Sequence, residues 1–417
     1  MTNIQELEKW RKQIHEVGTR FGLDYYDMVY ELVPTDVMYM FGSYGMPNRF
    51  HHWRFGKRFA RMQKMQQLGL MKIYELVINT NPCYAFLLEN NTLLENKLIM
   101  AHVLGHSDFF KNNRKFKGTN TRMLDEMKIH ANKMKEYEQQ HGIEAVEKII
   151  DMAMSIEEQT ALTNAVLESP KLQEWEKHIV RMIQTEFTYF SPQMETKIIN
   201  EGWATYWHVR IMQEILDDEQ EIIDYAKMHS MVVKANPKSI NPYLLGYKIF
   251  EDIERRYGRE KIFEVRELDS DITFIRQYLT EEVATALNMF TYKSHNRDEN
   301  IVWNDEMDIV KFTLIQSMIN KGYPVLTAHH EEKEFVITHH ADSRKLNQDH
   351  LEKVLALVYP YLEQEIIKVH TKANGEPVKL VYDGVKLIFQ KYVNDVETKW
   401  YFDGTRYIIE KAEETEG

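Results

Sequence analysis

Two short segments of this chain carry residue types and spacings that suit the binding of a metal ion. His102 and His106 lie four residues apart in AHVLGHSDFFKNN, so on a helix both side chains lie on one face. Glu201 begins EGWATYWH, which is also compatible with a helix. Two histidines from one helix and a carboxylate from a later one form the ligand set of many zinc hydrolases. The pattern therefore predicts a site for zinc, or for another divalent metal, formed by His102, His106 and Glu201.

The same residues also have an ordinary structural interpretation. An isolated H-x-x-x-H pair occurs on helices whose histidines form internal hydrogen bonds, and the aromatic residues after Glu201 suit a packed helix. The apolar neighbours Val103 and Leu104 favour a buried helix, however, and an unpaired imidazole is costly in such a place. Burial therefore favours the metal interpretation.

A catalytic base is missing from its usual position. Zinc hydrolases of this kind usually carry a glutamate directly after the first histidine, where this chain has Val103. The candidates for the base are His130, His208 and Glu186. His130 follows Glu126 by four residues, which equally suits a plain surface pair, and Glu186 interrupts the apolar and aromatic stretch RMIQTEFTYF.

The spacing of His208 from Glu201 limits its role. Seven residues correspond to about 10 Å along a helix axis, which is too far for both side chains to bind one ion comfortably. His208 is better suited to orient a ligand, to carry protons or to bind a second ion. Asp108, two residues after His106, is a further candidate to orient an imidazole.

Composition and charge limit the class of protein. The chain has 417 residues and a single cysteine, Cys83, which excludes an internal disulfide and fits a reducing compartment. No apolar run is long enough to span a membrane, and the charged N-terminus lacks a secretory signal, so we expect a cytoplasmic protein. The net charge of −12 argues against general nucleic-acid binding.

Positive charge is nevertheless concentrated near the histidine motif. Residues 37–74 contain no acidic residue but seven cations, and KNNRKFK directly follows His106 and its neighbours. These cations either form solvated helix faces or form a positive rim that attracts an anionic substrate or partner to the site.

The periodicity of the sequence changes near residue 295. Residues 1–295 are expected to form a mostly helical domain, with a turn at Asn81-Pro82. Residues 296–410 are expected to form a smaller α+β domain, because YPVLTAHH and EFVITHH suit strands and Asp383-Gly384 and Asp403-Gly404 suit hairpin turns. Residues 411–417 are expected to form an acidic tail.

Several longer segments resemble the SpoVR family, the stage V sporulation protein R group of bacteria. The similar segments are VMYMFGSYGMPNRFHHW, NTNPCYAFLLENN, AHVLGHSDFFKNN, MKIHANKM, KIINEGWATYWH and NPYLLGYKIFEDIE. The resemblance implies a role in forming the spore cortex, a modified peptidoglycan, although relatives also occur in bacteria that do not sporulate and the family is not tied to a settled reaction. The motifs include His102, His106, Asp108, His130, Glu201 and His208. EGWA also looks like the third-ligand helix of some gluzincin peptidases, which leaves open a zincin-like helical core.

Three functions are consistent with these observations. The leading hypothesis is a zinc-dependent hydrolase that cuts an amide bond in a cell-wall precursor or peptide, with an anionic substrate as one possibility. The second is a di-metal carboxylate protein, whose ligands would come from facing helices. The third is a non-enzymatic scaffold or regulator of cortex assembly, supported by the missing glutamate at position 103.

Overall fold

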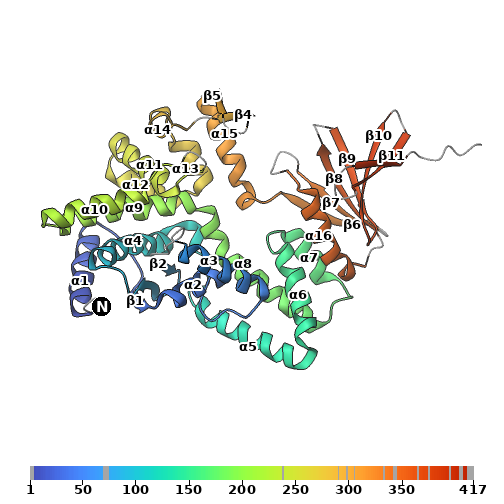
Figure 1. The fold of residues 1–417 in the computed structure, drawn as a ribbon, viewed down its shortest axis with the longest axis horizontal. Coiled ribbons are helices and arrows are strands. Elements are labelled where there is room, and N and C mark those ends of the chain that lie inside the picture. The colour runs from blue at the N-terminus through green and yellow to red at the C-terminus, as the bar shows by residue number, and fades with distance from the viewer. Residues whose placement is uncertain are drawn as a thin grey trace, which may run out of the picture. The chain divides into compact units, whose positions relative to one another are not determined.

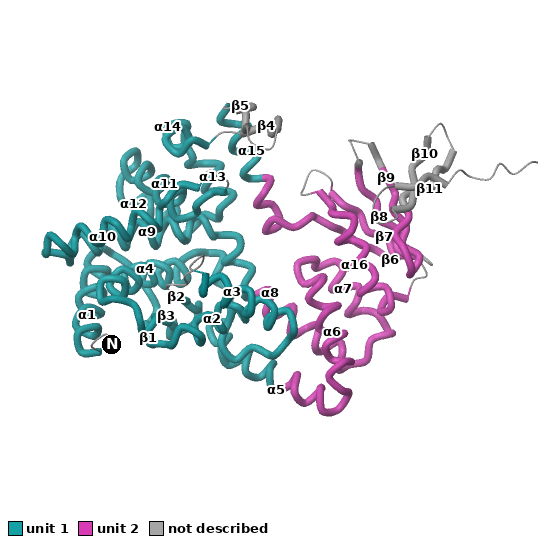
Figure 2. Tube along the Cα trace, in the orientation of Figure 1, with its two compact units in different colours: residues 1–132, 189–315 teal, residues 133–188, 316–417 magenta. Residues whose placement is uncertain are grey.

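The computed structural model describes most of the chain. The described residues are 4–68, 75–236, 239–289, 291–296, 299–304, 306–331, 334–340, 345–363, 366–373, 376–393, 396–402 and 407–410. They form two compact units, one of residues 1–132 with 189–315 and one of residues 133–188 with 316–417 (Figure 2). Each unit combines distant segments of sequence, so its limits differ from the predicted division into residues 1–295 and 296–410. Because compactness alone does not show what folds independently, that division stays a prediction. The predicted tail, 411–417, lies outside the described residues.

The first unit is mainly helical, which confirms the predicted class of this part of the chain (Figure 1). Its helices are α1 (Ile4–Arg20), α2 (Thr35–Tyr44), α3 (Trp53–Gln67), α4 (Leu93–Asn112), η1 (Arg114–Phe116), α9 (Lys197–Ile215), α10 (Glu219–Val232), α11 (Pro242–Tyr257), α12 (Arg259–Leu268), α13 (Asp271–Tyr278) and α14 (Glu281–Ala286). Three further helices run from one unit into the other: α5 (Met123–His141), α8 (Glu174–Glu195) and α15 (Met307–Met318). Among the described residues, no helix is both long and apolar enough to cross a membrane.

The first unit also contains short strands that the sequence analysis missed. β1 (Met28–Val33) pairs in parallel with β3 (Cys83–Leu88), which pairs antiparallel with β2 (Glu75–Ile78). A hairpin of β4 (Thr291–Asn296) and β5 (Glu299–Asn304) follows later. The expected domain is mostly helical, as predicted, but no strand was predicted at Cys83–Leu88. The run CYAFLL is continuously apolar, and periodicity cannot distinguish a buried strand from a buried helix in so short a run.

The second unit combines helices with a mixed sheet. Its helices are α6 (Ile143–Ile156), α7 (Thr160–Glu168), η2 (Ile319–Gly322), α16 (Gln348–Val358) and η3 (Tyr359–Tyr361). Its strands are β6 (Leu326–Glu331), β7 (Glu334–His339), β8 (Ile366–Ala373), β9 (Glu376–Tyr382), β10 (Leu387–Val393), β11 (Val396–Phe402) and β12 (Tyr407–Glu410). The sheet follows chain order from β6 to β12, and β7 pairs in parallel with β8 while the other pairs are antiparallel.

The predicted strands of the C-terminal region are confirmed. The two β-prone runs form β6 and β7, and Asp383-Gly384 lies between the antiparallel strands β9 and β10. Asp383 accepts backbone hydrogen bonds from Val385 and Lys386, which fixes this turn. The turn predicted at Asp403-Gly404 lies outside the described residues, although the flanking strands β11 and β12 pair as expected.

Two buried helices, α4 and α9, form the centre of the first unit. Thr92 caps α4 reciprocally with Glu95, which satisfies backbone donors at the start of the helix. Asp271 caps α9, because its carboxylate accepts hydrogen bonds from the backbone nitrogens of Ile198 (3.0 Å) and Ile199 (2.9 Å). Helix α4 is buried continuously from Asn96 to Phe110, as expected for a helix packed on all sides.

Glycines allow these helices to pack with their backbones in contact. A Cβ atom on Gly105 of α4 would lie 2.8 Å from the Cα atom of Ala204 of α9. A Cβ atom on Gly202 of α9 would lie 2.4 Å from the backbone of Gly246 of α11. Both contacts are adjacent in sequence to candidate metal ligands, so the packing of the helices also positions those ligands.

We expect Gly202→Ala to destabilise the protein by about 1–3 kcal/mol or more, because the backbone of Gly246 cannot move aside as a side chain can. The matched control is Gly56→Ala in α3, where an added Cβ atom contacts nothing within 4 Å. There the same change should stabilise the protein by about 0.5–1 kcal/mol, since glycine is a poor helix former. Chemical denaturation followed by tryptophan fluorescence measures both, and equal effects at the two positions would contradict the packing argument.

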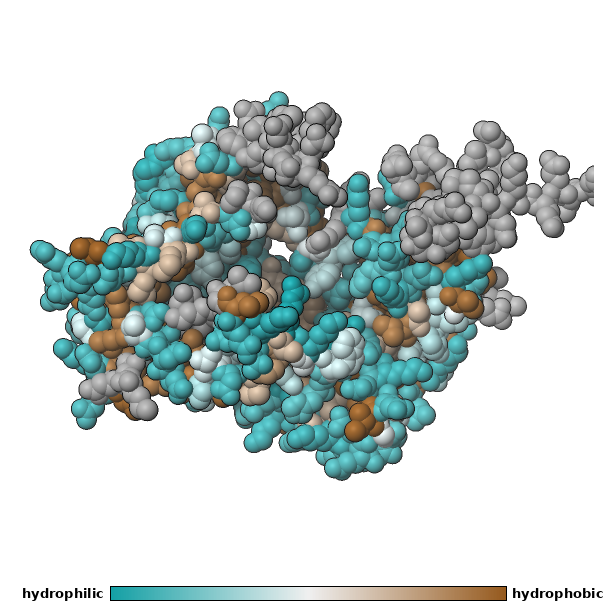
Figure 3. All heavy atoms as spheres, in the orientation of Figure 1, coloured by the Kyte–Doolittle hydropathy of each residue, from teal (hydrophilic) through white to brown (hydrophobic). Residues whose placement is uncertain are grey.

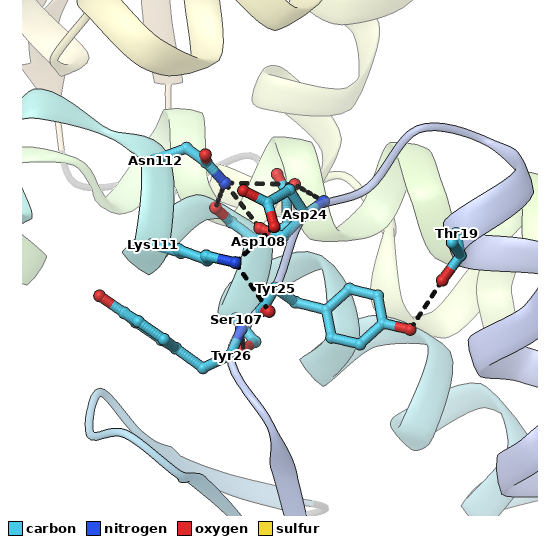
Figure 4. Close-up of polar contacts among 8 residues, drawn as sticks. All are labelled: Thr19, Asp24, Tyr25, Tyr26, Ser107, Asp108, Lys111 and Asn112. Carbon is cyan, nitrogen blue, oxygen red and sulfur yellow. Dashed lines mark hydrogen bonds and ion pairs between the residues drawn. The ribbon is translucent and has the colours of Figure 1, made fainter.

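Asp108 ties α4 to its neighbours (Figure 4). One carboxylate oxygen accepts a hydrogen bond from the backbone nitrogen of Asp24 (2.7 Å), and the other accepts one from the indole nitrogen of Trp203 (2.8 Å). Ser107 similarly accepts from the backbone nitrogen of Tyr26 (3.1 Å). Burial raises the pKa of Asp108 to about 6 in spite of these contacts. Among the described contacts, Asp108 therefore holds the backbone at Asp24 and the Trp203 side chain of α9. None of these contacts orients a histidine ring, the role suggested from sequence.

Candidate metal site

The structure brings His102, His106 and Glu201 together as a compact group of donor atoms. The Nε2 atoms of the two histidines lie 3.1 Å apart. The Oε2 atom of Glu201 lies 3.5 Å from Nε2 of His102 and 3.3 Å from Nε2 of His106. Ligands bound to zinc at about 2.0 Å in a tetrahedron are separated by about 3.3 Å. The three donor atoms therefore already have the spacing that one zinc-sized ion requires.

Hydrogen bonds on the far side of His106 determine where its lone pair points. Nδ1 of His106 donates to the side-chain oxygen of Asn200 at 2.9 Å. Since an amide oxygen only accepts, Nδ1 must carry the proton and the neutral ring has an unprotonated Nε2. This Nε2 faces Glu201 Oε2, a buried atom without a hydrogen-bond partner of good geometry. Such an orphaned oxygen beside the unprotonated Nε2 of His106 fits a bound cation.

The pKa values of these groups also indicate that the site stabilises a positive charge. Burial opposes charge on His106, but the neighbouring Glu201 carboxylate and Asn200 outweigh burial and raise the pKa of this histidine. Burial would raise the pKa of Glu201, but the two histidines hold it well below its ordinary range. The group is therefore suited to hold one positive charge, either a proton or a metal ion.

A chain of histidines continues from His102 toward α10. Nδ1 of His102 lies 3.0 Å from Nδ1 of His208, and Nε2 of His208 lies 3.1 Å from Nδ1 of His229. If Nε2 of His102 binds a metal, its Nδ1–H donates to His208, and His208 in turn donates to His229. Burial and the surrounding histidines lower the pKa of His208 well below its ordinary value, so the ring is neutral and suited to this relay.

A cavity of about 250 Å³ lies beside the group. It is lined by Glu75, Glu95, Leu98, Ile99, His102, His208, Met228, Met231, Val232 and Tyr243. Tyr243 stacks on His102, with ring centroids 5.8 Å apart, and burial together with the nearby Glu201 carboxylate raises the pKa of Tyr243. The Glu201 side chain is 18% exposed, whereas the two histidines are almost fully buried.

Glu75 is the main residue that sequence reasoning missed. It begins β2, a strand that the helical pattern around it did not indicate, and no motif marks it. Burial raises its pKa, with a further contribution from the charge of Glu201. Asn200 and His229 were missed as well, although the position of Asn200 directly before Glu201 was a usable signal.

The other predicted residues are not part of this group of donor atoms. Val103 is fully buried in the core and does not line the cavity. His130 lies 3.3 Å from Glu126 on α5, which agrees with the plain i,i+4 pair. Glu186 is fully buried on α8, in the second unit. Neither His130 nor Glu186 belongs to the donor group described above, and the catalytic roles of His130, His208 and Glu186 stay predictions.

The positive segments differ in how far they are neutralised. In the second segment, Lys111 pairs with Asp24 and Lys115 pairs with Glu195 at 2.5 Å. The first segment places exposed cations on α3: Lys57, Arg58, Arg61 and Lys64. Recognition of an anionic partner by these residues stays a prediction.

Comparisons with known proteins agree with the resemblance seen in the sequence. A family model described as "SpoVR like protein" matches residues 1–168 and 162–323. The uncharacterized protein YcgB of Escherichia coli (strain K12) is 28% identical over 384 residues, covering 70% of this chain and 75% of that protein. No solved structure matches the chain.

Proposed function

Because this chain belongs to the SpoVR-like family and holds a buried His–His–Glu group beside a cavity, we propose that it is a metal-dependent hydrolase that cuts an amide bond. The observation that carries the proposal is the spacing of the three donor atoms, 3.1–3.5 Å, around an orphaned carboxylate oxygen. Two histidines and one carboxylate with an open fourth position are typical of catalytic zinc sites, so zinc is the metal we propose. A zincin-like relation of the two ligand helices is part of the same proposal.

Bound zinc supplies an activated water molecule and polarises the carbonyl group that is attacked. Asn200 holds His106 in the tautomer that presents Nε2, and His208 would accept the Nδ1–H of His102 when Nε2 of His102 binds the metal. Tyr243 packs against the His102 ring and limits its rotation. Glu75, which lines the cavity with His102, accepts the proton of the attacking water and returns it to the leaving amine.

Glu75 is a better candidate for the base than the residues predicted from sequence. His208 uses both ring nitrogens in contacts with His102 and His229. His130 contacts Glu126 on its own helix, and neither His130 nor Glu186 is among the described residues that line the cavity. The carboxyl of Glu75 therefore takes the role that Val103 cannot provide.

The substrate class follows from the family rather than from the site. We propose a peptide or a cell-wall precursor, with a role in forming the spore cortex in organisms that sporulate. A cytoplasmic location belongs to this proposal, supported by Cys83, whose buried thiol donates to the backbone oxygen of Ile78 (3.2 Å). As part of the same proposal, the exposed cations of α3 attract an anionic group of the substrate that lies outside the cavity.

The decisive experiment is metal analysis of protein purified without a histidine tag. We expect one zinc ion per chain, together with cleavage of amide bonds in a mixture of peptides and peptidoglycan fragments, followed by mass spectrometry and abolished by a chelator. Well-folded protein that neither contains nor binds a divalent metal would overturn the proposal and favour a scaffold. Two irons per chain would favour the di-metal alternative, although among the described residues one such donor group is found.

Asn200 provides a graded test of the site. We expect Asn200→Leu to weaken zinc binding by about 10–100-fold, because His106 loses the acceptor that fixes its tautomer. Asn200→Asp keeps an acceptor oxygen and should retain most of the affinity. Competition with a fluorescent zinc chelator measures both variants, and equal loss in both would contradict the orienting role.

A further inference from the structure

The lining of the cavity beside the donor group is mainly apolar. On α4, Glu95, Leu98, Ile99 and His102 occupy one helix face, at the spacing i, i+3, i+4 and i+7. Three more lining residues come from the end of α10: Met228, Met231 and Val232. His102, which belongs to the donor group, thus lines the same cavity as these aliphatic side chains.

The outer part of the cavity is accessible from solvent. Met231 is 63% exposed, and the same helix exposes Ile222 and Ile223. In Figure 3 apolar side chains reach the surface over α10 on a face that is otherwise mainly hydrophilic. An elongated group can therefore enter past α10 while its other end contacts the donor group.

The formally charged side chains that line this cavity in the described part of the chain have one sign. They are Glu75 and Glu95, and neither Lys nor Arg is among the described lining residues. A carboxylate or phosphate placed there would be repelled by these two groups, whereas an ammonium group would be attracted. One oxygen of Glu95 accepts the capping hydrogen bond of Thr92, so its side chain is fixed in position.

We propose that the cavity is the substrate's side-chain subsite, and that it selects an aliphatic segment that is uncharged or positively charged at its far end. This inference rests on the proposed function, because the aliphatic segment is attached to the group that reaches the metal. It adds to that function the kind of residue that is recognised next to the amide bond. This residue is long and aliphatic or amine-bearing, in preference to an acidic one.

Binding of hydroxamates to the zinc-loaded protein tests the subsite directly, with isothermal titration calorimetry as the measurement. The probes are acetohydroxamate, hexanohydroxamate, and the ω-amino and ω-carboxy derivatives of hexanohydroxamate. Hexanohydroxamate should bind at least about tenfold more tightly than acetohydroxamate, because several more methylene groups leave water. The ω-amino derivative should bind at least about tenfold more tightly than the ω-carboxy derivative, since the lining charges are negative.

Two variants locate the effect. Val232→Phe should remove the advantage of the longer chain by filling the cavity, whereas the matched change Ile223→Phe lies on the same helix outside the cavity and should preserve it. Glu95→Gln should reduce the discrimination between the amino and carboxy derivatives, and glutamine still satisfies the helix cap. Equal binding of the short and long hydroxamates, or preference for the carboxy derivative, would overturn the subsite.

A separate measurement on metal-free protein distinguishes failure of the subsite from failure of the proposed function. Saturation-transfer NMR should detect hexylamine more strongly than hexanoate, and Val232→Phe should weaken the hexylamine signal. If the protein binds no metal but shows this pattern, the hydrolase proposal fails and the subsite stands. If acetohydroxamate binds the zinc-loaded protein but neither the chain-length effect nor the hexylamine signal is seen, the subsite fails and the hydrolase proposal stands.

Discussion

Glu201→Gln is expected to lower zinc affinity by at least about 100-fold. This loss is larger than the usual effect of removing a residue that only hydrogen-bonds to a metal ligand. The reason is that Oε2 of Glu201 completes the donor triangle with His102 and His106 and supplies its negative charge. A neutral amide of the same shape keeps the packing but loses that charge. Zinc at about 1,000 times its dissociation constant should stabilise the wild-type protein by about 4 kcal/mol, and this stabilisation should be largely lost in the variant.

Glu214→Gln is the matched control for this change. Glu214 also lies on α9, but it is exposed and pairs with Arg20 at 2.5 Å, so its loss should affect neither zinc affinity nor stability measurably. Metal-dependent thermal shifts and chelator competition apply to both variants. If Glu201→Gln binds zinc as tightly as Glu214→Gln, the donor triangle is not a metal site.

Glu75→Gln should reduce the rate of amide hydrolysis by about 100–10,000-fold, the range typical for loss of a general acid–base group. Zinc content should remain at the wild-type level, because Glu75 does not belong to the donor group. The expected signature is therefore a fall in kcat with full metal occupancy. The measurement is turnover of whichever peptide the mass-spectrometric screen identifies, with metal analysis of the same samples.

Glu31→Gln is the control, since Glu31 is an exposed glutamate on β1 of the same sheet. It should leave both turnover and metal content unchanged. If Glu75→Gln turns over substrate at the wild-type rate, another residue is the base, and His130, His208 and Glu186 are the residues to test next. Loss of zinc in Glu75→Gln would instead make this glutamate a ligand.

The part of the site that sequence predicted is the part determined by spacing along one helix. The i,i+4 relation places His102 and His106 on one face whatever surrounds them, and a second helix beginning near Glu201 needs only its own periodicity. The partners of these residues depend on tertiary contacts instead. Asn200 reaches His106 because α4 and α9 touch at Gly105 and Ala204, which no local pattern reveals.

The fold was predictable to a similar extent. Long helices and the hairpin at Asp383-Gly384 follow from local periodicity and turn chemistry, and they are confirmed. β1 pairs with β3 across 55 positions of sequence (Met28 with Cys83), whereas β2 and β3 pair locally, and all three strands are too short for a clear period. Glu75 was missed because β2 has only 4 residues, and so short a strand shows no clear alternation of its own.

The close contact of α4, α9 and α11 determines which ions the donor triangle can accept. Gly105 and Gly202 lie directly beside His106 and Glu201, so the distance between ligand-bearing backbones is set by hard contact and not by flexible side chains. A calcium ion, with bonds of about 2.3–2.6 Å, needs a wider triangle and more oxygen ligands than these helices provide. Packing between backbones therefore limits the width of the donor triangle, which favours ions with short metal–ligand bonds over a larger ion such as calcium.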